Sequence, residues 1–143
     1  MSKIPTKCIS SITVSQIVLE EQRSKMTFSN KARRGYKKIK IDGCVFSAID
    51  GKKCDWLLQS CQYGDQYFVE LKGSDYKEAE RQIAATIDRL PKTTEDAKRS
   101  AFVILANRGP KIDTWRQMTE KKYKDKGIKI YFKESGYEHI LDR

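Results

Sequence analysis

The chain has 143 residues, with 29 Lys or Arg against 19 Asp or Glu, which gives a formal charge of +10 at pH 7. This length supports one domain (1–143) with a hydrophobic core, and 38% hydrophobic with 34% charged residues is typical of a folded globular chain rather than a disordered one. No stretch approaches the roughly 18 consecutive apolar residues of a membrane-spanning helix, and no export signal is visible.

The N-terminal part is predicted to contain a frayed start, one helix and a basic loop. Residues 1–10 carry Pro5 and scattered polar residues, so we expect them to fray. Residues 10–26 combine β-branched side chains with the helix-favouring stretch LEEQRSK, from which we predict a short helix. Residues 31–40, KARRGYKKIK, contain six basic residues and no acid, and predict an exposed loop leading into a strand.

Three strands and two turns are predicted next. The stretch 38–46, KIKIDGCVF, alternates as a strand does, and an Asp-Gly pair within 49–53 predicts a turn. Two further strands, 53–59 and 66–72, are joined by a reversal at Gly64-Asp65. Consecutive strands with short connections favour an antiparallel meander.

A helix is predicted after Gly73. Asp75 and Glu78 have the spacing of a capping box, and Pro91 ends the helix. Its apolar residues recur at helical spacing and predict the buried stripe Tyr76, Ala79, Ile83, Ile87 and Leu90.

The C-terminal part predicts two parallel additions to the same sheet. AFVILANRG (101–109) is a continuous apolar run, the mark of a strand buried on both faces. A helix at 112–124 and an alternating strand at 128–132 follow. We therefore predict an α/β fold with a central mixed sheet flanked by helices, in the order α-β-β-β-α-β-α-β.

The hairpin of 53–59 and 66–72 is predicted to bring two acids together. A reversal that pairs Gln59 with Gln66 places Asp55 directly opposite Glu70. The side chains then sort into two faces. One face collects Cys54, Trp56, Leu58, Tyr67, Val69 and Leu71; the other has Leu57 and Phe68, with Asp55, Glu70 and Lys72 at its end.

Two opposed carboxylates need compensation, because like charges at that position are destabilising. Lys72 supplies one positive charge, and the pair of acids also suits a hard divalent cation such as Mg²⁺ or Mn²⁺. Such an ion polarises a phosphodiester and activates water, while a lysine holds the phosphate or the attacking water, or accepts a proton. The pattern predicts phosphodiester hydrolysis with one or two metal ions; the alternative is an ion triad at a solvated strand end.

With Asp55 in KKCDWLLQ and Glu70-Leu71-Lys72 in FVELKG, followed by a helix and an apolar strand, the chain resembles the PD-(D/E)XK nuclease superfamily over residues 12–132. This superfamily contains restriction endonucleases and Holliday-junction resolvases. The resemblance implies a restriction-endonuclease-like fold and a metal-dependent deoxyribonuclease. Asp55, Glu70 and the carbonyl of Leu71 would bind the metal, and Lys72 would be catalytic.

The resemblance also implies two further site residues. Gln82, on the helix after the lysine, corresponds to a catalytic glutamine of many members. An acid of the first helix joins the site in the family, and Glu20 and Glu21 are both candidates. Cys54 stands where the family has the proline of its name, a position without a chemical duty.

The positive charge favours a polyanionic partner, and the resemblance favours DNA as that partner, while no residue excludes RNA. The best candidate contact residues are those of the basic loop: Lys31, Arg33, Arg34, Lys37 and Lys38. A solvated basic face is the alternative for this loop. The rival function is a non-catalytic nucleic-acid-binding or interaction module, and endonuclease or exonuclease action and a homodimer stay open.

The cysteines and the single histidine exclude some chemistry. Cys8, Cys44, Cys54 and Cys61 allow two bridges, but without a Cys-x-x-Cys pair or an export signal we expect reduced, partly buried thiols in a cytoplasmic protein. His139 alone does not support a paired-histidine nuclease site or a common His/Cys zinc site. We expect it to be structural or exposed to solvent.

Overall fold

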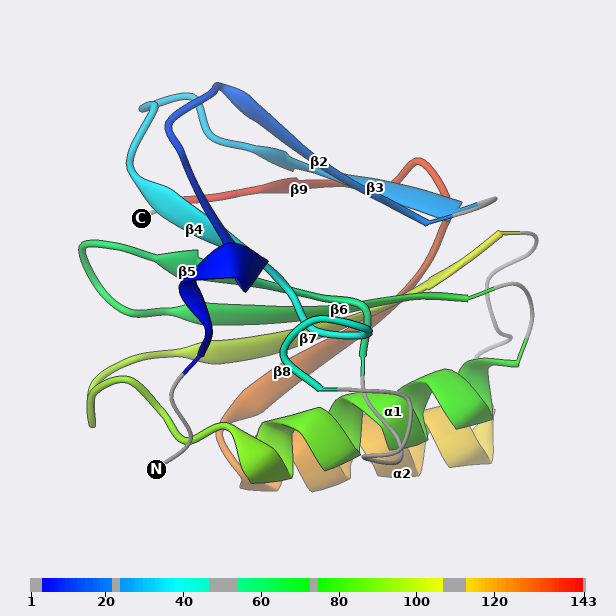
Figure 1. Cartoon of the computed structure of the whole chain (residues 1–143). Coiled ribbons are helices and arrows are strands. Elements are labelled where there is room, and N and C mark those ends of the chain that lie inside the picture. Colours follow the sequence, from blue (N-terminus) through cyan, green and yellow to red (C-terminus); the bar gives the residue numbers. More distant parts are fainter. Residues whose placement is uncertain (1–3, 22–23, 47–53, 73–74, 107–112, 143) are drawn as a thin grey trace.

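The protein forms three layers: two helices, a six-stranded sheet and a three-stranded sheet (Figure 1). The structure, a computed structural model, describes residues 4–21, 24–46, 54–72, 75–106 and 113–142. Of Lys72 it describes the backbone only. The predicted turn at 49–53 lies outside the described residues. The fold is therefore mixed α/β with a central mixed sheet, as predicted.

The large sheet has the strand order β1-β4-β5-β6-β7-β8. Its strands are β1 (Ile9–Ile12), β4 (Tyr36–Lys40), β5 (Trp56–Ser60), β6 (Gln66–Lys72), β7 (Arg99–Leu105) and β8 (Ile128–Glu134). Strands β4, β5 and β6 pair antiparallel, which confirms the predicted meander, but its first strand is Tyr36–Lys40 rather than 38–46, because the chain turns after Lys40. Strands β7 and β8 add in parallel, through α1 (Tyr76–Arg89) and α2 (Thr114–Asp125), as also predicted.

The reversal between β5 and β6 lies where it was predicted. Gly64 has a φ of 73°, a left-handed conformation that glycine adopts without the steric cost of a side chain. A Cβ added there would also lie 2.1 Å from the Thr93 hydroxyl oxygen, which donates a hydrogen bond to the Gly64 carbonyl. Glycine is thus required at this turn for two independent reasons.

The small sheet corrects the prediction of an N-terminal helix. Residues 10–26 contain no helix in their described part; they supply the end of β1, all of β2 (Gln16–Glu21) and the start of β3 (Ser24–Ser29). Buried and exposed side chains alternate along β2, where Ile17 and Leu19 are buried and Val18 between them is exposed. This period of two is that of a strand with one buried face. Strand β9 (Glu138–Ile140) completes the sheet, parallel to β3.

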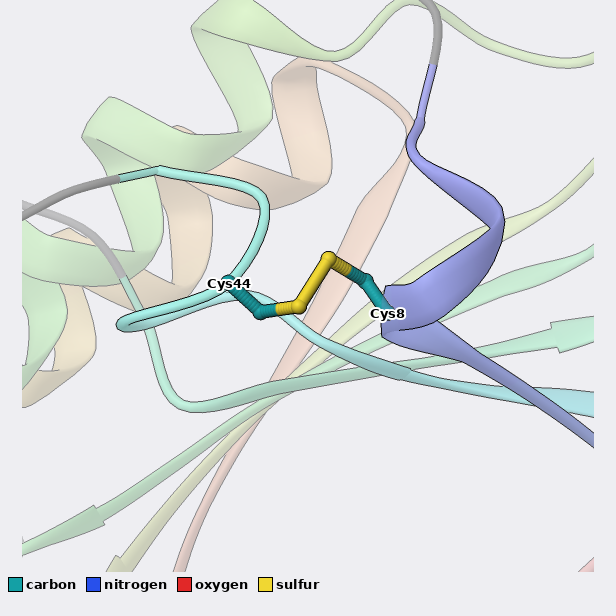
Figure 2. The surroundings of a disulfide bond; sticks show 2 residues. All are labelled: Cys8 and Cys44. Carbon is teal, nitrogen blue, oxygen red and sulfur yellow. A yellow bond between two sulfur atoms is a disulfide. The ribbon is translucent and has the colours of Figure 1, made fainter.

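The N-terminus corrects two further predictions. Thr6–Cys8 forms a 3-10 turn and Ile9 begins β1, so the predicted fraying is wrong from residue 4 onward. Cys8 is buried and forms a disulfide with Cys44, in the turn after β4 (Figure 2). The expectation of reduced thiols is therefore wrong for this pair, whose connectivity cannot be read from cysteine spacing. The other two are free thiols, Cys54 buried and Cys61 exposed.

Helix α1 confirms the predicted cap and stripe. The Asp75 carboxylate accepts a hydrogen bond from the Glu78 backbone N–H at 3.0 Å, and the helix ends at Arg89, before Pro91. The apolar stripe packs into the core between the helices and the large sheet, with Tyr76 only partly buried and Ala79, Ile83, Ile87 and Leu90 buried.

Strand β7 is buried on both faces, as predicted for the continuous apolar run. Val103 and Leu105 belong to the core under the helices, and Phe102 and Ile104 to the core under the small sheet. His139, on β9, packs edge-on against Phe102 with ring centroids 4.9 Å apart, so it has the structural role expected for it. Burial lowers the pKa of His139.

In the parts of the chain that the structure describes, no helix is long and apolar enough to cross a membrane.

Candidate active site

The register of the β5–β6 hairpin is the predicted one. Trp56 lies opposite Val69 and Gln59 opposite Gln66. Asp55 precedes the first paired residue of β5 and therefore lies beside the end of β6. Its Oδ2 accepts a hydrogen bond from the backbone N–H of Leu71 at 2.8 Å. The sequence thus predicted which end of which strands carries the acids.

The face predicted for Cys54 is wrong, because the chain bends at Asp55. Cys54 lies in the core under the helices, where its backbone N–H donates to the Thr86 Oγ1 of α1 at 2.7 Å. In a straight ladder Cys54 would pair with Leu71. The bend removes it, and the Asp55 carboxylate accepts the Leu71 N–H in its place.

The bend also orients a main-chain oxygen. The N–H and C=O of one strand residue point to the same side of the strand, because paired residues exchange both hydrogen bonds with one neighbour. The Leu71 N–H points to Asp55, on the β5 side of β6, so the Leu71 carbonyl points to the β5 side as well. Asp55 and this carbonyl are therefore neighbours at the rim of the sheet.

Glu70 lies in contact with Asp55. Its side chain is only 3% exposed, on the opposite face of β6 from Val69 and Leu71, which belong to the core under the small sheet. The two side chains influence each other, because Glu70 lowers the pKa of Asp55. Two carboxyl groups in contact can share a proton or a cation, so the pair is suited to hold either.

The electrostatics of Asp55 reflect its burial. Burial is the largest effect and raises the pKa of Asp55. The hydrogen bond from Leu71 opposes this increase, while the nearby carboxylate of Glu21 adds to it. Lys40 and Glu70 lower the pKa of Asp55 again, with smaller effect. The net result is a carboxyl group that is costly to ionise unless a positive charge approaches.

Of the two candidate acids near the N-terminus, only Glu21 lies beside the site. Glu20 is exposed on the outer face of β2, whereas Glu21 forms an ion pair with Lys40 and acts on Asp55. The Lys40 ammonium also lies 4.7 Å from the ring centroid of Trp56. The strand alternation within residues 16–21 was the signal that could have separated the two acids.

Gln82 reaches the neighbourhood of the site through α1. Its backbone carbonyl accepts a hydrogen bond from the Thr86 hydroxyl, which in turn accepts from Cys54, the residue before Asp55. The Gln82 Oε1 is buried and has no hydrogen-bond partner among the described residues. Lys72 is placed by its backbone alone, paired with Leu105 at the end of β6.

The basic loop lies at the other end of the sheet. Tyr36, at the start of β4, pairs with Ser60, at the end of β5, while Asp55 adjoins the start of β5. Five strand residues separate these ends, which amounts to about 17 Å. The exposed Lys31 and Arg33 precede β4 and therefore lie far from the acids.

The remaining predicted contact residues also diverge. Lys37 and Lys38 are neighbours on β4 and so point to opposite faces of the sheet. The Lys38 ammonium donates to the Val18 carbonyl at 2.9 Å, and one guanidinium nitrogen of Arg34 is buried. The five residues therefore do not form one surface beside the site.

The residues of the site fit a divalent metal with few protein ligands. Among the described residues, no group of three or more His, Cys, Asp and Glu side chains is arranged to hold a metal ion. Two carboxylates, of Asp55 and Glu70, and the carbonyl of Leu71 remain. Mg²⁺ commonly takes only one or two protein carboxylates and keeps water or phosphate oxygens in its other positions, so this donor set is sufficient.

Comparison with known proteins does not assign the chain to a family: no family model matches it, and neither the curated proteins nor the solved structures give a significant match. The fold is thus defined as mixed α/β, and the site as a buried carboxyl pair at the end of its central sheet.

Proposed function

We propose that the protein is a metal-dependent nuclease that hydrolyses phosphodiester bonds of nucleic acid, DNA in particular. One observation carries the proposal: Asp55 accepts the Leu71 N–H and contacts the buried Glu70 at the rim of the central sheet. This is where the predicted register puts the acids of a PD-(D/E)XK-like site. Stability alone does not favour two carboxyl groups in contact, whereas cation binding does.

In this proposal Asp55, Glu70 and the Leu71 carbonyl hold Mg²⁺ or Mn²⁺. The bound ion supplies a Lewis acid for the phosphate and an activated water. Lys72, the next residue along β6, holds the scissile phosphate or the attacking water. Gln82 offers a buried amide oxygen on the helix side, suited to orienting a water.

The Glu21–Lys40 ion pair has a supporting part in the proposal. A metal ion at Asp55 would place a second positive charge beside Lys40. The nearby carboxylate of Glu21 supplies a negative charge that opposes it. We infer that Glu21 offsets the added positive charge and thereby strengthens metal binding, without being required as a ligand.

The disulfide bears on the cytoplasmic location that was expected from the cysteines. The Cys8–Cys44 disulfide is more typical of an oxidising compartment, because cytosolic thiols are kept reduced. We propose that the protein acts where this disulfide persists.

A second function is favoured by one observation. The described residues offer no third acidic ligand, which is what a degenerate nuclease fold acting as a non-catalytic nucleic-acid-binding module would show. Such a module would bind nucleic acid without metal and would not cleave it.

The test is cleavage of labelled duplex and single-stranded DNA and RNA in Mg²⁺, Mn²⁺ or EDTA. We expect metal-dependent cleavage that falls at least about a hundredfold in Asp55→Asn, Glu70→Gln and Lys72→Ala. Glu95→Gln, which changes an exposed acid in the loop after α1, is the matched control and should cleave as the wild type does. Cleavage in EDTA, or cleavage that survives all three substitutions, would contradict the proposal.

A further inference from the structure

Three partly buried rings, from β8 and from the segment that leads into and forms β9, lie close together. Tyr131 comes from β8, and Tyr137 and His139 come from the segment that continues into β9 (Figure 1). The Tyr131 and His139 ring centroids are 5.2 Å apart, and the Tyr137 hydroxyl lies 3.1 Å from the His139 Nδ1. We name Tyr131, Tyr137 and His139 the aromatic mouth.

The core fixes the rings of the aromatic mouth. Tyr131 stacks on the buried Phe102, with ring centroids 4.7 Å apart and an interplanar angle of 3°. Phe102 in turn packs edge-on against Phe28 and His139. Rings that are held from behind and partly exposed in front lose little conformational entropy when a planar ligand stacks on them.

Two lysines flank the aromatic mouth. The Lys129 ammonium lies 5.1 Å from the Tyr131 ring centroid, and the Lys133 ammonium lies 5.2 Å from that of Tyr137. Both lysines share a face of β8 with Tyr131, because each lies two positions from Tyr131 along the strand. Burial lowers the pKa of His139, so the positive charge near neutral pH comes from the lysines.

A hollow continues this surface around the edge of β8. Its volume is about 480 Å³, and Lys124 and Lys129 line it together with Glu120 and the strand residues Ile128 and Ile130. This volume lies within the range of small-ligand sites and accommodates a nucleotide.

Two exposed acids, Glu138 and Asp142, lie near His139 in the aromatic mouth. Asp142 raises the pKa of His139.

Lys133, which flanks the aromatic mouth, lies at the same level along the sheet as the acid pair. Lys133 pairs with Ile104, and Ile104 pairs with Leu71, so Lys133 is level with the rim of the active site. Two strand spacings separate them, about 10 Å. Lys133 shares the small-sheet face with Leu71, whereas Glu70 lies on the other face, so a bound strand reaches the acids only by passing around the end of the sheet.

Lysines on an edge strand also have a protective explanation, since they prevent pairing with another sheet. That explanation covers Lys129 and Lys133. It does not cover Tyr131 and Tyr137 beside them, which are only partly buried. Alternating cationic and aromatic groups are what single-stranded nucleic acid requires, with phosphates on the lysines and bases stacked on the rings.

We propose that the aromatic mouth binds a single-stranded segment of nucleic acid, with bases stacked on Tyr131 and Tyr137 and phosphates paired with Lys129 and Lys133. The proposal rests on the proposed function in one respect: the bound strand is the substrate of the acid pair. A duplex keeps its bases paired and offers no free base face, so it binds this surface less tightly.

The test is fluorescence anisotropy of a labelled oligothymidylate in EDTA, where no metal-dependent cleavage occurs. We expect the dissociation constant to rise about tenfold in Tyr137→Leu and in Tyr131→Leu. Lys133→Ala should weaken binding and reduce its salt dependence. Tyr63→Leu, in the β5–β6 turn, and Lys121→Ala, on α2, are the matched controls and should bind as the wild type does.

Unchanged binding by Tyr137→Leu would overturn the inference, as would tighter binding of a duplex of the same length. Thermal melting of each variant identifies one that fails to fold. Asp55→Asn separates the two proposals, because it should bind oligothymidylate as the wild type does. Tyrosine-dependent binding without any cleavage would support the aromatic mouth and reject the nuclease, and cleavage with tyrosine-independent binding would do the reverse.

Discussion

Asp55 organises the candidate site because its side chain replaces a missing ladder partner. The bend that takes Cys54 to the helix side leaves the Leu71 N–H at the strand end, and the Asp55 carboxylate accepts it at 2.8 Å. The same bend buries the carboxyl group, which raises its pKa. A carboxyl group held in this way costs the free protein stability, and in the proposed function a bound cation offsets that cost.

We predict that Asp55→Asn stabilises the metal-free protein while it abolishes cleavage. The folded-state pKa of Asp55 is raised above the unfolded value, so the unfolded state releases the proton first as the pH increases. The stability that the protonated form contributes is therefore complete below pH 3.8 and is lost as the pH rises through the raised pKa. Asparagine keeps an oxygen that accepts the Leu71 N–H and has no charge to bury.

Thermal unfolding in EDTA from pH 4 to pH 8 measures this effect. The melting temperature of Asp55→Asn should exceed that of the wild type at pH 8, and the difference should shrink toward pH 4. Adding Mg²⁺ should raise the melting temperature of the wild type alone. A less stable Asp55→Asn at pH 8 would show that the ionised carboxylate is already well paired without a metal.

Other residues of the site were less accessible to sequence reasoning. The register of the hairpin followed from the hydrophobic alternation of two adjacent strands and predicted that Asp55 lies near Glu70, although the bend leaves Asp55 outside the ladder, which ends at Trp56 and Val69. The choice between Glu20 and Glu21 did not follow, because it depends on a strand that was predicted as a helix. The position of Cys54 could not be predicted, because it depends on the bend at Asp55 and no residue pattern indicates that bend.

Among the elements, those with a long uninterrupted pattern were predicted correctly. Strands β5, β6 and β7 and helix α1 have a clear period or a continuous apolar run, together with turn and capping residues at their ends. Strands β2 and β3 are short and contain residues with high helix propensity. They form a sheet because Ile17, Leu19, Met26 and Phe28 bury one face against the large sheet, and such tertiary packing overrides local propensity.

The disulfide that fastens the N-terminal turn to the turn after β4 gives an element-scale prediction. Cys8 and Cys44 are 36 residues apart, and closing such a loop in the unfolded chain is expected to contribute about 3–4 kcal/mol. The Cys44 turn adjoins the site strand, since the Ile41 N–H donates to the Asp55 carbonyl at 3.0 Å. Reduction should therefore lower both stability and metal affinity.

Denaturation with and without a reductant measures the first effect, and Cys8→Ser with Cys44→Ser replaces the reductant as a chemical control. Thiol titration of the native, unreduced protein should modify Cys61, which is exposed, and spare the buried Cys54. Rapid modification of four thiols in the unreduced protein would contradict the disulfide.

At the scale of the whole molecule, the layered fold places the buried acid pair at one end of the central sheet. The start of β5, the end of β6 and the end of β2 meet there, and α1 covers the helix side. The formal charge of +10 favours approach of a polyanion to this end, although the basic loop that precedes β4 lies at the opposite one. Lys40 at the end of β4 and Lys133 near the end of β8 lie closer to the acids than the exposed Lys31 and Arg33 of that loop.

The most direct measurement of the central claim is anomalous scattering from crystals grown or soaked in MnCl₂. We predict one or two Mn²⁺ peaks about 2–2.3 Å from carboxylate oxygens of Asp55 and Glu70 and from the Leu71 carbonyl, and no peak there in Asp55→Asn. Crystals in which Asp55 and Glu70 remain in direct contact at high Mn²⁺, with no metal between them, would contradict the proposal.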